Sequence, residues 1–252
     1  MNFVRLKRKI AILTGMHLKF KRLSTWNSED LRTTEILRTF GFNKVLDIGA
    51  NKGQFSEPLF DFGFRGQIVS FEPTSESYDI LRKKVTKFPN WQLAEKCAIG
   101  DQERKIEMNI SKNSVFNSVK KISNDYSDYN SDSSVIGKEE VEMVTVDSLK
   151  GKYFDDEDRV FLKIDTQGYE QEVLEGAKES LRSVKGIKIE MPLQPVYDDV
   201  SWNMIDILRF FKDKGFECIS LSEVAVNKKT GIVHEMDGIF IEKELLKSIK
   251  NN

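Results

Sequence analysis

The sequence has 252 residues, of which 39 are Lys or Arg and 40 are Asp or Glu, and its formal net charge is −1. A chain of this length can bury a sizeable core as one α/β domain, and no linker rich in Pro, Gly or Ser divides it. Residues 1–23 are basic and contain no acid, so the rest of the chain is acidic. An acidic body argues against an extended nucleic-acid groove, which needs clustered cations.

The cysteine content and the hydropathy suggest where the protein resides. Cys97 and Cys218 are the only cysteines, too few for a disulfide framework or a thiolate metal site. No apolar run approaches the roughly 20 residues that span a bilayer. We therefore expect a reduced, cytoplasmic protein.

The N-terminal 40 residues are expected to form a helical extension to a domain over residues 41–252. In residues 1–23, apolar side chains recur at helical spacing among basic ones, which predicts a basic amphipathic helix. Such a helix either packs on the body or makes peripheral contact with an anionic membrane surface. Residues 28–40 predict a second helix, with Ser28 as its N-cap and Gly41 at its end.

Residues 45–55 predict a buried strand, a tight turn and a helix, because a short apolar run ends in glycines and an amphipathic segment follows. Gly49 allows the turn, and Gly53 lets a ligand or a neighbouring backbone approach closely. Asp47 would repel a phosphate and instead suits a positively charged ligand, such as the amino-acid end of S-adenosylmethionine. The residues expected to bind this ligand are Asp47, Gly49, Ala50, Asn51, Gly53 and Phe55.

Two further acidic residues follow predicted strands. Residues 66–73 end in Glu72 and Pro73, and an acid about 20 residues after a glycine turn is placed to accept hydrogen bonds from ribose hydroxyls. A third strand over residues 91–99 precedes Asp101, which either accepts from the exocyclic amine of an adenine or is an ordinary turn residue. Together these acids predict a site for an adenosine-containing ligand.

Several sequence blocks resemble the FkbM family of S-adenosylmethionine-dependent methyltransferases. These blocks are Asp47-Ile48-Gly49-Ala50-Asn51-x-Gly53, Phe71-Glu72-Pro73, Ala98-Ile99-Gly100-Asp101, Asn117-Ser118, Val144 to Leu149, and Lys163-Ile164-Asp165-x-x-Gly168-x-Glu170. The resemblance implies a Rossmann-like class I methyltransferase that methylates oxygen, often a sugar or polyketide hydroxyl. The sequence departs from the family pattern at Gln167, where Glu is more common.

An insertion is expected at about residues 103–146 of the methyltransferase domain. Strands over 103–110 and 139–146 bracket residues 111–137, which are dense in Ser, Asn, Asp and Lys. A segment of this composition is either a functional lid or a disordered loop. Its candidates for contact with cofactor or substrate are Asn117, Ser118, Phe116, Tyr126 and Tyr129.

Catalytic candidates follow the fourth and fifth strands, over residues 159–165 and 184–191. Asp165 would lie beside the methyl group, where it could act as a base, or bind a divalent cation such as magnesium together with Glu190. The alternatives for Asp165 are to cap the next helix or to orient the cofactor. His234, in the connection between the predicted last strands over 216–221 and 238–242, is a third candidate base or a solvated loop residue.

The predicted fold is α/β, with a seven-stranded, mostly parallel sheet, an antiparallel last strand and helices on both faces. The predicted function is S-adenosylmethionine-dependent O-methylation of a hydroxyl on a small molecule, most often a sugar or glycan. Two alternatives stay open: a nicotinamide-dependent oxidoreductase, and a non-catalytic cofactor-binding interaction module in a glycan or lipid assembly complex.

Overall fold

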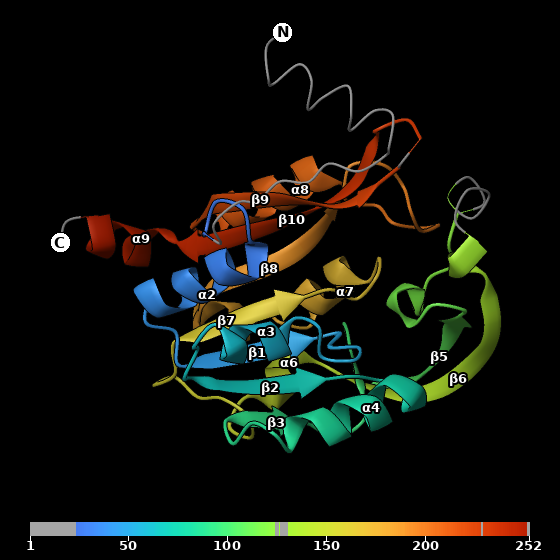
Figure 1. Ribbon diagram of the computed structural model, residues 1–252, viewed down its shortest axis with the longest axis horizontal. Helices are drawn as coiled ribbons and strands as arrows, with labels where there is room; N and C mark the ends of the chain where they lie inside the picture. The colour runs from blue at the N-terminus through green and yellow to red at the C-terminus, as the bar shows by residue number, and fades with distance from the viewer. Residues whose placement is uncertain (1–23, 124–125, 127–130, 228, 251–252) are drawn as a thin grey trace, which may run out of the picture.

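The computed structural model describes residues 24–123, 126, 131–227 and 229–250. Seven strands form one sheet in the order β3-β2-β1-β7-β8-β10-β9. The first five are parallel, and β10 runs antiparallel to both of its neighbours (Figure 1). The predicted class I methyltransferase fold, with its antiparallel last strand, is therefore confirmed.

The strands of this sheet are β1 Lys44–Ile48, β2 Gln67–Phe71, β3 Trp91–Leu93, β7 Val160–Ile164, β8 Val184–Pro192, β9 Phe216–Val226 and β10 Val233–Glu242. The helices are α2 Glu29–Thr39, α3 Ser56–Asp61, α4 Ser75–Val85, α6 Val146–Leu149, α7 Glu170–Glu175, α8 Met204–Asp213 and α9 Lys243–Lys250. All five residues of β7 are buried. Continuous burial of this kind is typical of a parallel strand that is covered on both faces.

Two clusters of apolar side chains fill the two faces of the sheet. Along β1, Leu46 and Ile48 belong to one cluster and Val45 to the other, as the two-residue period of a strand requires. Residues of α6, α7 and α8 pack in the first cluster, and residues of α2, α3, α4 and α9 in the second. No helix among the described residues combines the length and hydropathy that crossing a membrane would require.

The second predicted helix is confirmed as α2. Ser28 is its N-cap and accepts a hydrogen bond from the Leu31 backbone N–H at 3.3 Å. Gly41, just past its C-terminus, has a φ of +65°, which suits glycine. Residues 1–23, with the predicted basic amphipathic helix, and Tyr129 lie outside the described residues.

The predicted third strand over residues 91–99 is wrong, because the chain leaves the main sheet after Leu93. Residues Ala98–Ile99 form β4, which pairs with β6 (Val135–Val144) in a separate three-stranded sheet of order β4-β6-β5. The third strand of that sheet is β5, Arg104–Ser111. The exposed Glu95 and Lys96 separate the two apolar pieces, which explains the break. The expected β insertion is otherwise present.

The last two strands are longer than predicted. A tight connection joins them, in which the Asn227 N–H donates to the Ile232 carbonyl at 2.8 Å. His234 consequently lies within β10 and not in a loop, which corrects the sequence prediction. The carboxyl ends of β1, β2 and β7 point toward the insertion strands β5 and β6 (Figure 1). This edge of the sheet is where open α/β folds bind ligands.

Candidate active site

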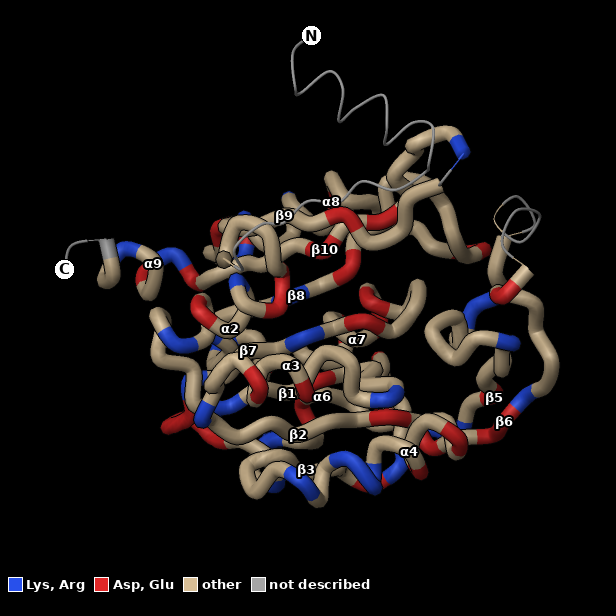
Figure 2. Tube along the Cα trace, viewed as in Figure 1, with Lys and Arg blue, Asp and Glu red and all other residues tan. Residues whose placement is uncertain are grey.

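A cavity of about 460 Å³ lies at the carboxyl edge of the parallel strands. One half is lined by residues that follow β1 and β2, among them Gly49, Asn51 and Glu72. The other half is lined by Asp165, Gln167, Glu190 and Glu235, from the ends of β7 and β8 and the start of β10. Acidic positions occur on β10 and near the start of α7 (Figure 2). We call the two parts the cofactor half and the acceptor half.

Glycines shape the turn after β1, but they do so in two different ways. Gly49 has a φ of +73°, and a Cβ there would lie 1.8 Å from the Asp165 carbonyl oxygen, so the ends of β1 and β7 touch. Gly53 has a φ of +82°, and its Cβ would meet the side chain of Trp91 at 2.7 Å. Gly53 therefore allows close packing against a core side chain, whereas the sequence predicted close approach of a ligand or of a neighbouring backbone.

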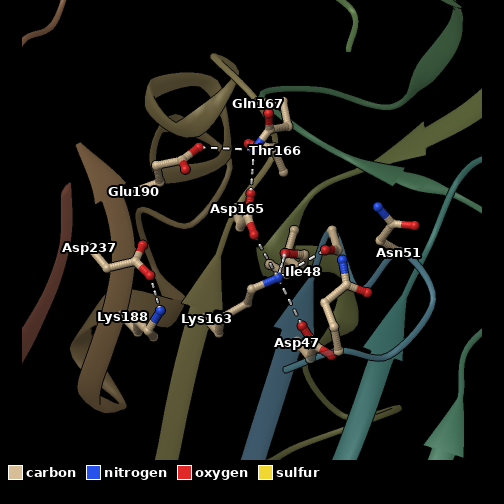
Figure 3. Close-up of polar contacts among 12 residues, drawn as sticks. Asp47, Ile48, Asn51, Lys163, Asp165, Thr166, Gln167, Lys188, Glu190 and Asp237 are labelled. Carbon is tan, nitrogen blue, oxygen red and sulfur yellow. Dashed lines mark hydrogen bonds and ion pairs between the residues drawn. The ribbon is translucent and has the colours of Figure 1, made fainter. Parts of the chain in front are cut away.

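Asp47 does not reach the cavity, because its side chain is completely buried. The hydroxyls of Ser56 and Ser70 donate to its carboxylate at 2.7 and 3.0 Å. The ammonium of Lys163 lies 3.1 Å from its other oxygen (Figure 3). The sequence correctly indicated a cationic partner for Asp47, but that partner is a lysine of the protein itself, so the predicted direct contact with the ligand is wrong.

Lys163 joins the two halves of the cavity beneath its floor. Besides its ion pair with Asp47, its ammonium lies 3.4 Å from Asp165 and donates to the Gly49 carbonyl at 2.9 Å. Burial opposes the charge, but the two carboxylates raise the pKa of Lys163, which stays protonated. The sequence reasoning gave this residue no role. A lysine within the otherwise apolar strand β7 is the sequence feature that could have indicated a buried ion pair.

Glu72 is the best-placed polar side chain of the cofactor half. It is buried and accepts hydrogen bonds from the Asn51 N–H at 2.8 Å and from the Thr74 N–H at 3.0 Å. Burial raises the pKa of Glu72, while these bonds hold its carboxyl in place. The oxygen that faces Asn51 retains capacity for another donor, which suits a ribose hydroxyl. Pro73, predicted beside it, also lines the cavity.

Ala50 and Phe55, both predicted to bind the cofactor, belong to the core beneath the site. Ala50 is buried in the apolar cluster on the α2 and α3 face, and Phe55 packs against that cluster. The Phe55 ring lies 5.7 Å from the ammonium of Lys163 and 5.8 Å from that of Lys188. These residues support the floor of the site from below.

Asp101 is held beside the cavity and not in its wall. Its carboxylate pairs with Arg104 at 3.1 Å and accepts from the Tyr169 hydroxyl at 3.3 Å. The Tyr169 side chain does line the cavity. Asp101 therefore positions a tyrosine, and the predicted contact with an adenine amine is not supported by its placement.

The insertion closes over both halves. Asn117 lines the cavity and accepts from the Ser111 N–H at 2.8 Å, whereas Ser118 is fully buried and donates to the Gln167 carbonyl at 2.6 Å. The Ser114 hydroxyl donates to the Asn51 side chain at 3.0 Å. The described parts of the predicted loop thus pack on the site, and Phe116 and Tyr126 line the cavity as well.

Gln167 organises the acceptor half. Its side-chain amide donates to Asp165 at 2.7 Å and to Glu190 at 2.9 Å (Figure 3). The carbonyl of the same side chain accepts from the Tyr197 hydroxyl at 2.6 Å. The residue at which the sequence departs from the family pattern is therefore an amide that bridges two carboxylates.

The bridged carboxyls have opposite protonation tendencies. Burial disfavours charge on Asp165, yet Lys163 and the hydrogen bond from Gln167 lower its pKa below the usual value. Burial, together with the nearby carboxylates of Glu235 and Asp165, raises the pKa of Glu190 well above its usual value. Asp165 is consequently ionised at neutral pH, and Glu190 holds its proton more tightly than an ordinary Glu.

Glu235 is a functional residue that the sequence reasoning missed, while the neighbouring His234 was selected. Glu235 lines the cavity, and burial, with the carboxylates of Glu170 and Asp165, raises its pKa to about 8. The His234 ring instead packs against Tyr126 at 5.5 Å, and burial lowers its pKa. His234 is not among the residues that line the cavity, so the structure does not support His234 as the base.

Cation binding by Asp165 and Glu190, the alternative to a base at this position, is not supported in the part of the chain that the structure describes. No group of three or more His, Cys, Asp or Glu side chains there is arranged to hold a metal ion. Asp165 and Glu190, the two predicted ligands, share the N–H donors of Gln167. The side-chain amide of Gln167 therefore lies between the two carboxyls, where a bound cation would have to lie.

The strand order and the cavity at the switch from β1 to β7 define a Rossmann-like class I methyltransferase. The sequence model of the methyltransferase FkbM domain matches residues 47–218. The chain belongs to the FkbM family of S-adenosylmethionine-dependent methyltransferases. This assignment excludes the nicotinamide-dependent oxidoreductase. No curated protein matches the sequence.

Solved methyltransferase structures are similar at low identity. Magnesium protoporphyrin IX methyltransferase from Synechocystis PCC 6803, solved with bound S-adenosylmethionine, is 12% identical over 96% of this chain and 85% of that chain, with a TM-score of 0.46. Precorrin-6y C5,15-methyltransferase from Geobacter metallireducens GS-15 is 17% identical over 88% and 91%, with a TM-score of 0.42. A methyltransferase from Aquifex aeolicus is 14% identical over 88% and 100%, with a TM-score of 0.41.

The residues of the cofactor half fit S-adenosylmethionine, the cofactor of the family. Glu72 offers an acceptor to ribose hydroxyls, and the apolar side chains of Phe71 and Ile99 line the cavity beside it, where they suit a purine ring. The ionised Asp165, at the border of the two halves, suits a cationic group. The ribose, the purine and a cationic group of the cofactor thus each have side chains of matching chemistry.

Proposed function

We propose that the protein transfers the methyl group of S-adenosylmethionine to a hydroxyl of a sugar or glycan. The observation that carries this proposal is the extent of the cavity. It runs from Glu72 past Asp165 to Glu190 and Glu235, so that one cavity holds cofactor-binding side chains at one end and carboxyls at the other. Methyl transfer needs two such ligands in line.

The carboxyls of the acceptor half match the chemistry of an alcohol. When bound, S-adenosylmethionine supplies an electrophilic methyl group. The hydroxyl oxygen that attacks it must give up its proton, and a base with a pKa near the working pH does this best. Glu190 suits this role in its ionised form, because its raised pKa makes that form a stronger base than an ordinary Glu. Asp165, whose pKa is lowered, suits the cationic group of the cofactor.

Aromatic side chains support a sugar-like acceptor. Phe116, Tyr126 and Tyr169 line the cavity together with the carboxyls. Aromatic faces pack on the C–H surface of a sugar ring, while carboxylates and amides accept from or donate to its hydroxyls. Tyr126 contacts Phe116 with ring centroids 6.0 Å apart, so the two rings act as one wall.

The test is methyl transfer from isotope-labelled S-adenosylmethionine to a panel of sugars, glycosides and simple alcohols. We expect labelled O-methyl product with at least one hydroxyl acceptor, and calorimetric binding of both S-adenosylmethionine and S-adenosylhomocysteine. Absence of binding by either compound would refute the assignment of the cofactor. Tight binding with no transfer to any acceptor would favour the non-catalytic interaction module instead.

A further inference from the structure

Glu235 is a buried carboxyl with no partner in the described parts of the chain. Only 6% of the residue is exposed, and no described side chain or backbone group forms a hydrogen bond or ion pair with its carboxyl. It lines the large cavity and also a smaller one, which it shares with Glu190 and Tyr197. A buried carboxyl that faces a cavity without a partner is normally completed by a ligand.

The register of the sheet places Glu235 next to Glu190. Asp237 on β10 is directly opposite Glu190 on β8, and Glu235 is two residues earlier on the same strand. Side chains two residues apart share a face, and such diagonal cross-strand neighbours are about 7–8 Å apart. The two carboxyls therefore face one space, wide enough for a polar group to lie between them.

No cation of the described residues is available to this pair. The carboxyls that line the large cavity are Glu72, Asp165, Glu190 and Glu235, and none of its described lining residues is Lys, Arg or His. The two buried lysines nearby are already engaged: Lys163 with Asp47 and Asp165, and Lys188 with Asp237 and Glu29. A counter-charge for the ionised form of Glu235 would therefore come with the ligand.

We propose, building on the proposed O-methyl transfer, that the acceptor carries a protonated amine beside the hydroxyl that is methylated, and that Glu235 binds this ammonium. Glu190 then faces the hydroxyl. The acceptor class is the amino sugars and related amino alcohols. An ammonium beside Glu235 supplies both the missing charge and several N–H donors. A carboxylated or phosphorylated acceptor would instead meet carboxylates of its own sign.

A divalent cation is the competing occupant, and the geometry disfavours it. Gln167 directs an N–H at Glu190, and no described group of three metal-ligating side chains is present here. The raised pKa of Glu235 agrees with a site that lacks its positive partner. The cost of charging Glu235 falls when an ammonium enters.

The experiment measures the binding of four matched sugars to the full-length protein saturated with S-adenosylhomocysteine. The probes are glucosamine, glucose, N-acetylglucosamine and glucuronate, which carry an amine, a hydroxyl, an uncharged amide and a carboxylate. We expect glucosamine to bind at least tenfold more tightly than glucose and N-acetylglucosamine, and glucuronate to bind most weakly. Binding of glucuronate or N-acetylglucosamine as tight as that of glucosamine would overturn the proposal.

The variant Glu235→Gln keeps the shape and removes the charge, and it should abolish the preference for glucosamine while S-adenosylhomocysteine still binds. Glu223→Gln, at an exposed position of the adjacent β9, is the matched control and should leave the preference unchanged. Magnesium that competes with glucosamine in the wild-type protein would also overturn the proposal. The proposed O-methyl transfer fails separately, if labelled methyl reaches no hydroxyl acceptor at all.

Discussion

The two halves of the cavity hold their carboxyls in different ways. In the cofactor half, Glu72 accepts from two backbone N–H groups and from the Thr74 hydroxyl. In the acceptor half, Glu190 accepts from one side-chain amide and Glu235 from no described group. The cofactor half is thus preorganised by the protein, whereas the acceptor half retains unsatisfied acceptors for a ligand.

Sequence distance explains this difference. The cofactor half comes from two consecutive strand-turn-helix units, so its contacts, such as Asn51 with Glu72, span only 21 residues. The acceptor half is assembled from β7, β8 and β10 with the insertion above, and Ser118 reaches Gln167 across 49 residues. The cofactor half is formed by residues close together in the sequence, so it can be recognised as a sequence motif. The acceptor half combines distant segments, so it can vary with the acceptor.

The variants Glu190→Gln and Glu72→Gln should show the largest difference between the two halves, one in turnover and the other in cofactor affinity. We expect Glu190→Gln to lower kcat by about 10²–10⁴-fold, the usual contribution of a proton-transfer group, with little effect on the Kd of S-adenosylmethionine. Glu72→Gln should instead raise that Kd by about tenfold or more, because a hydrogen bond to a charged group is lost. Steady-state kinetics and calorimetry on the same preparations check both. Equal effects of the two variants on Kd would contradict the division.

Loss of the lysine between the halves should unfold the site. Lys163→Met leaves Asp47 buried without its counter-charge, which costs about 3–5 kcal/mol of unfolding free energy. Lys185→Met, which removes a partly exposed pair with Glu242, is the control and should cost about 0–1 kcal/mol. Urea denaturation measures both. A cost below about 1 kcal/mol for Lys163→Met would show that Asp47 does not depend on this charge.

The acceptor half should make stability depend on pH. Folding holds the pKa of Glu235 at about 8, above that of an unfolded Glu, so the unfolded state loses its proton first as pH rises. This group therefore lowers stability progressively from about pH 5 to pH 9 and has little further effect above that range. Glu170, at about 7, acts with the same sign, and Asp165, whose pKa is lowered, acts with the opposite one.

Glu235→Gln removes the titrating carboxyl. As pH rises from 5 to 8, the unfolding free energy of the variant should therefore increase relative to that of the wild type. Urea denaturation at pH 5, 6.5 and 8 measures the difference. The same variant should have no such effect between pH 9 and 10, which provides an internal control. A constant difference between variant and wild type from pH 5 to 8 would show that Glu235 is not held protonated by the fold.

The sequence allowed prediction of the sheet, the β1 turn and Glu72, because these depend on local patterns of apolar residues, glycines and acids. It did not allow prediction of the side to which each acid points. Asp47 faces inward because Lys163 lies on the neighbouring strand, and that neighbour is more than 100 residues away. Glu235 was missed for a related reason: the start of a strand and its inward face depend on pairing with β8.

Gln167→Glu restores the acid that is more common in the family and should produce the smallest effect. The variant lacks the side-chain N–H groups that bond Asp165 and Glu190, and its new carboxylate lies between those two carboxyls. We therefore expect the unfolding free energy to fall by about 1–3 kcal/mol. Gln194→Glu, at an exposed position, is the control and should be near neutral. Because three carboxylates would then converge, magnesium should raise the Tm of the variant and leave the wild type unchanged. Equal shifts in both proteins would mean that the Gln167 amide does not exclude a cation.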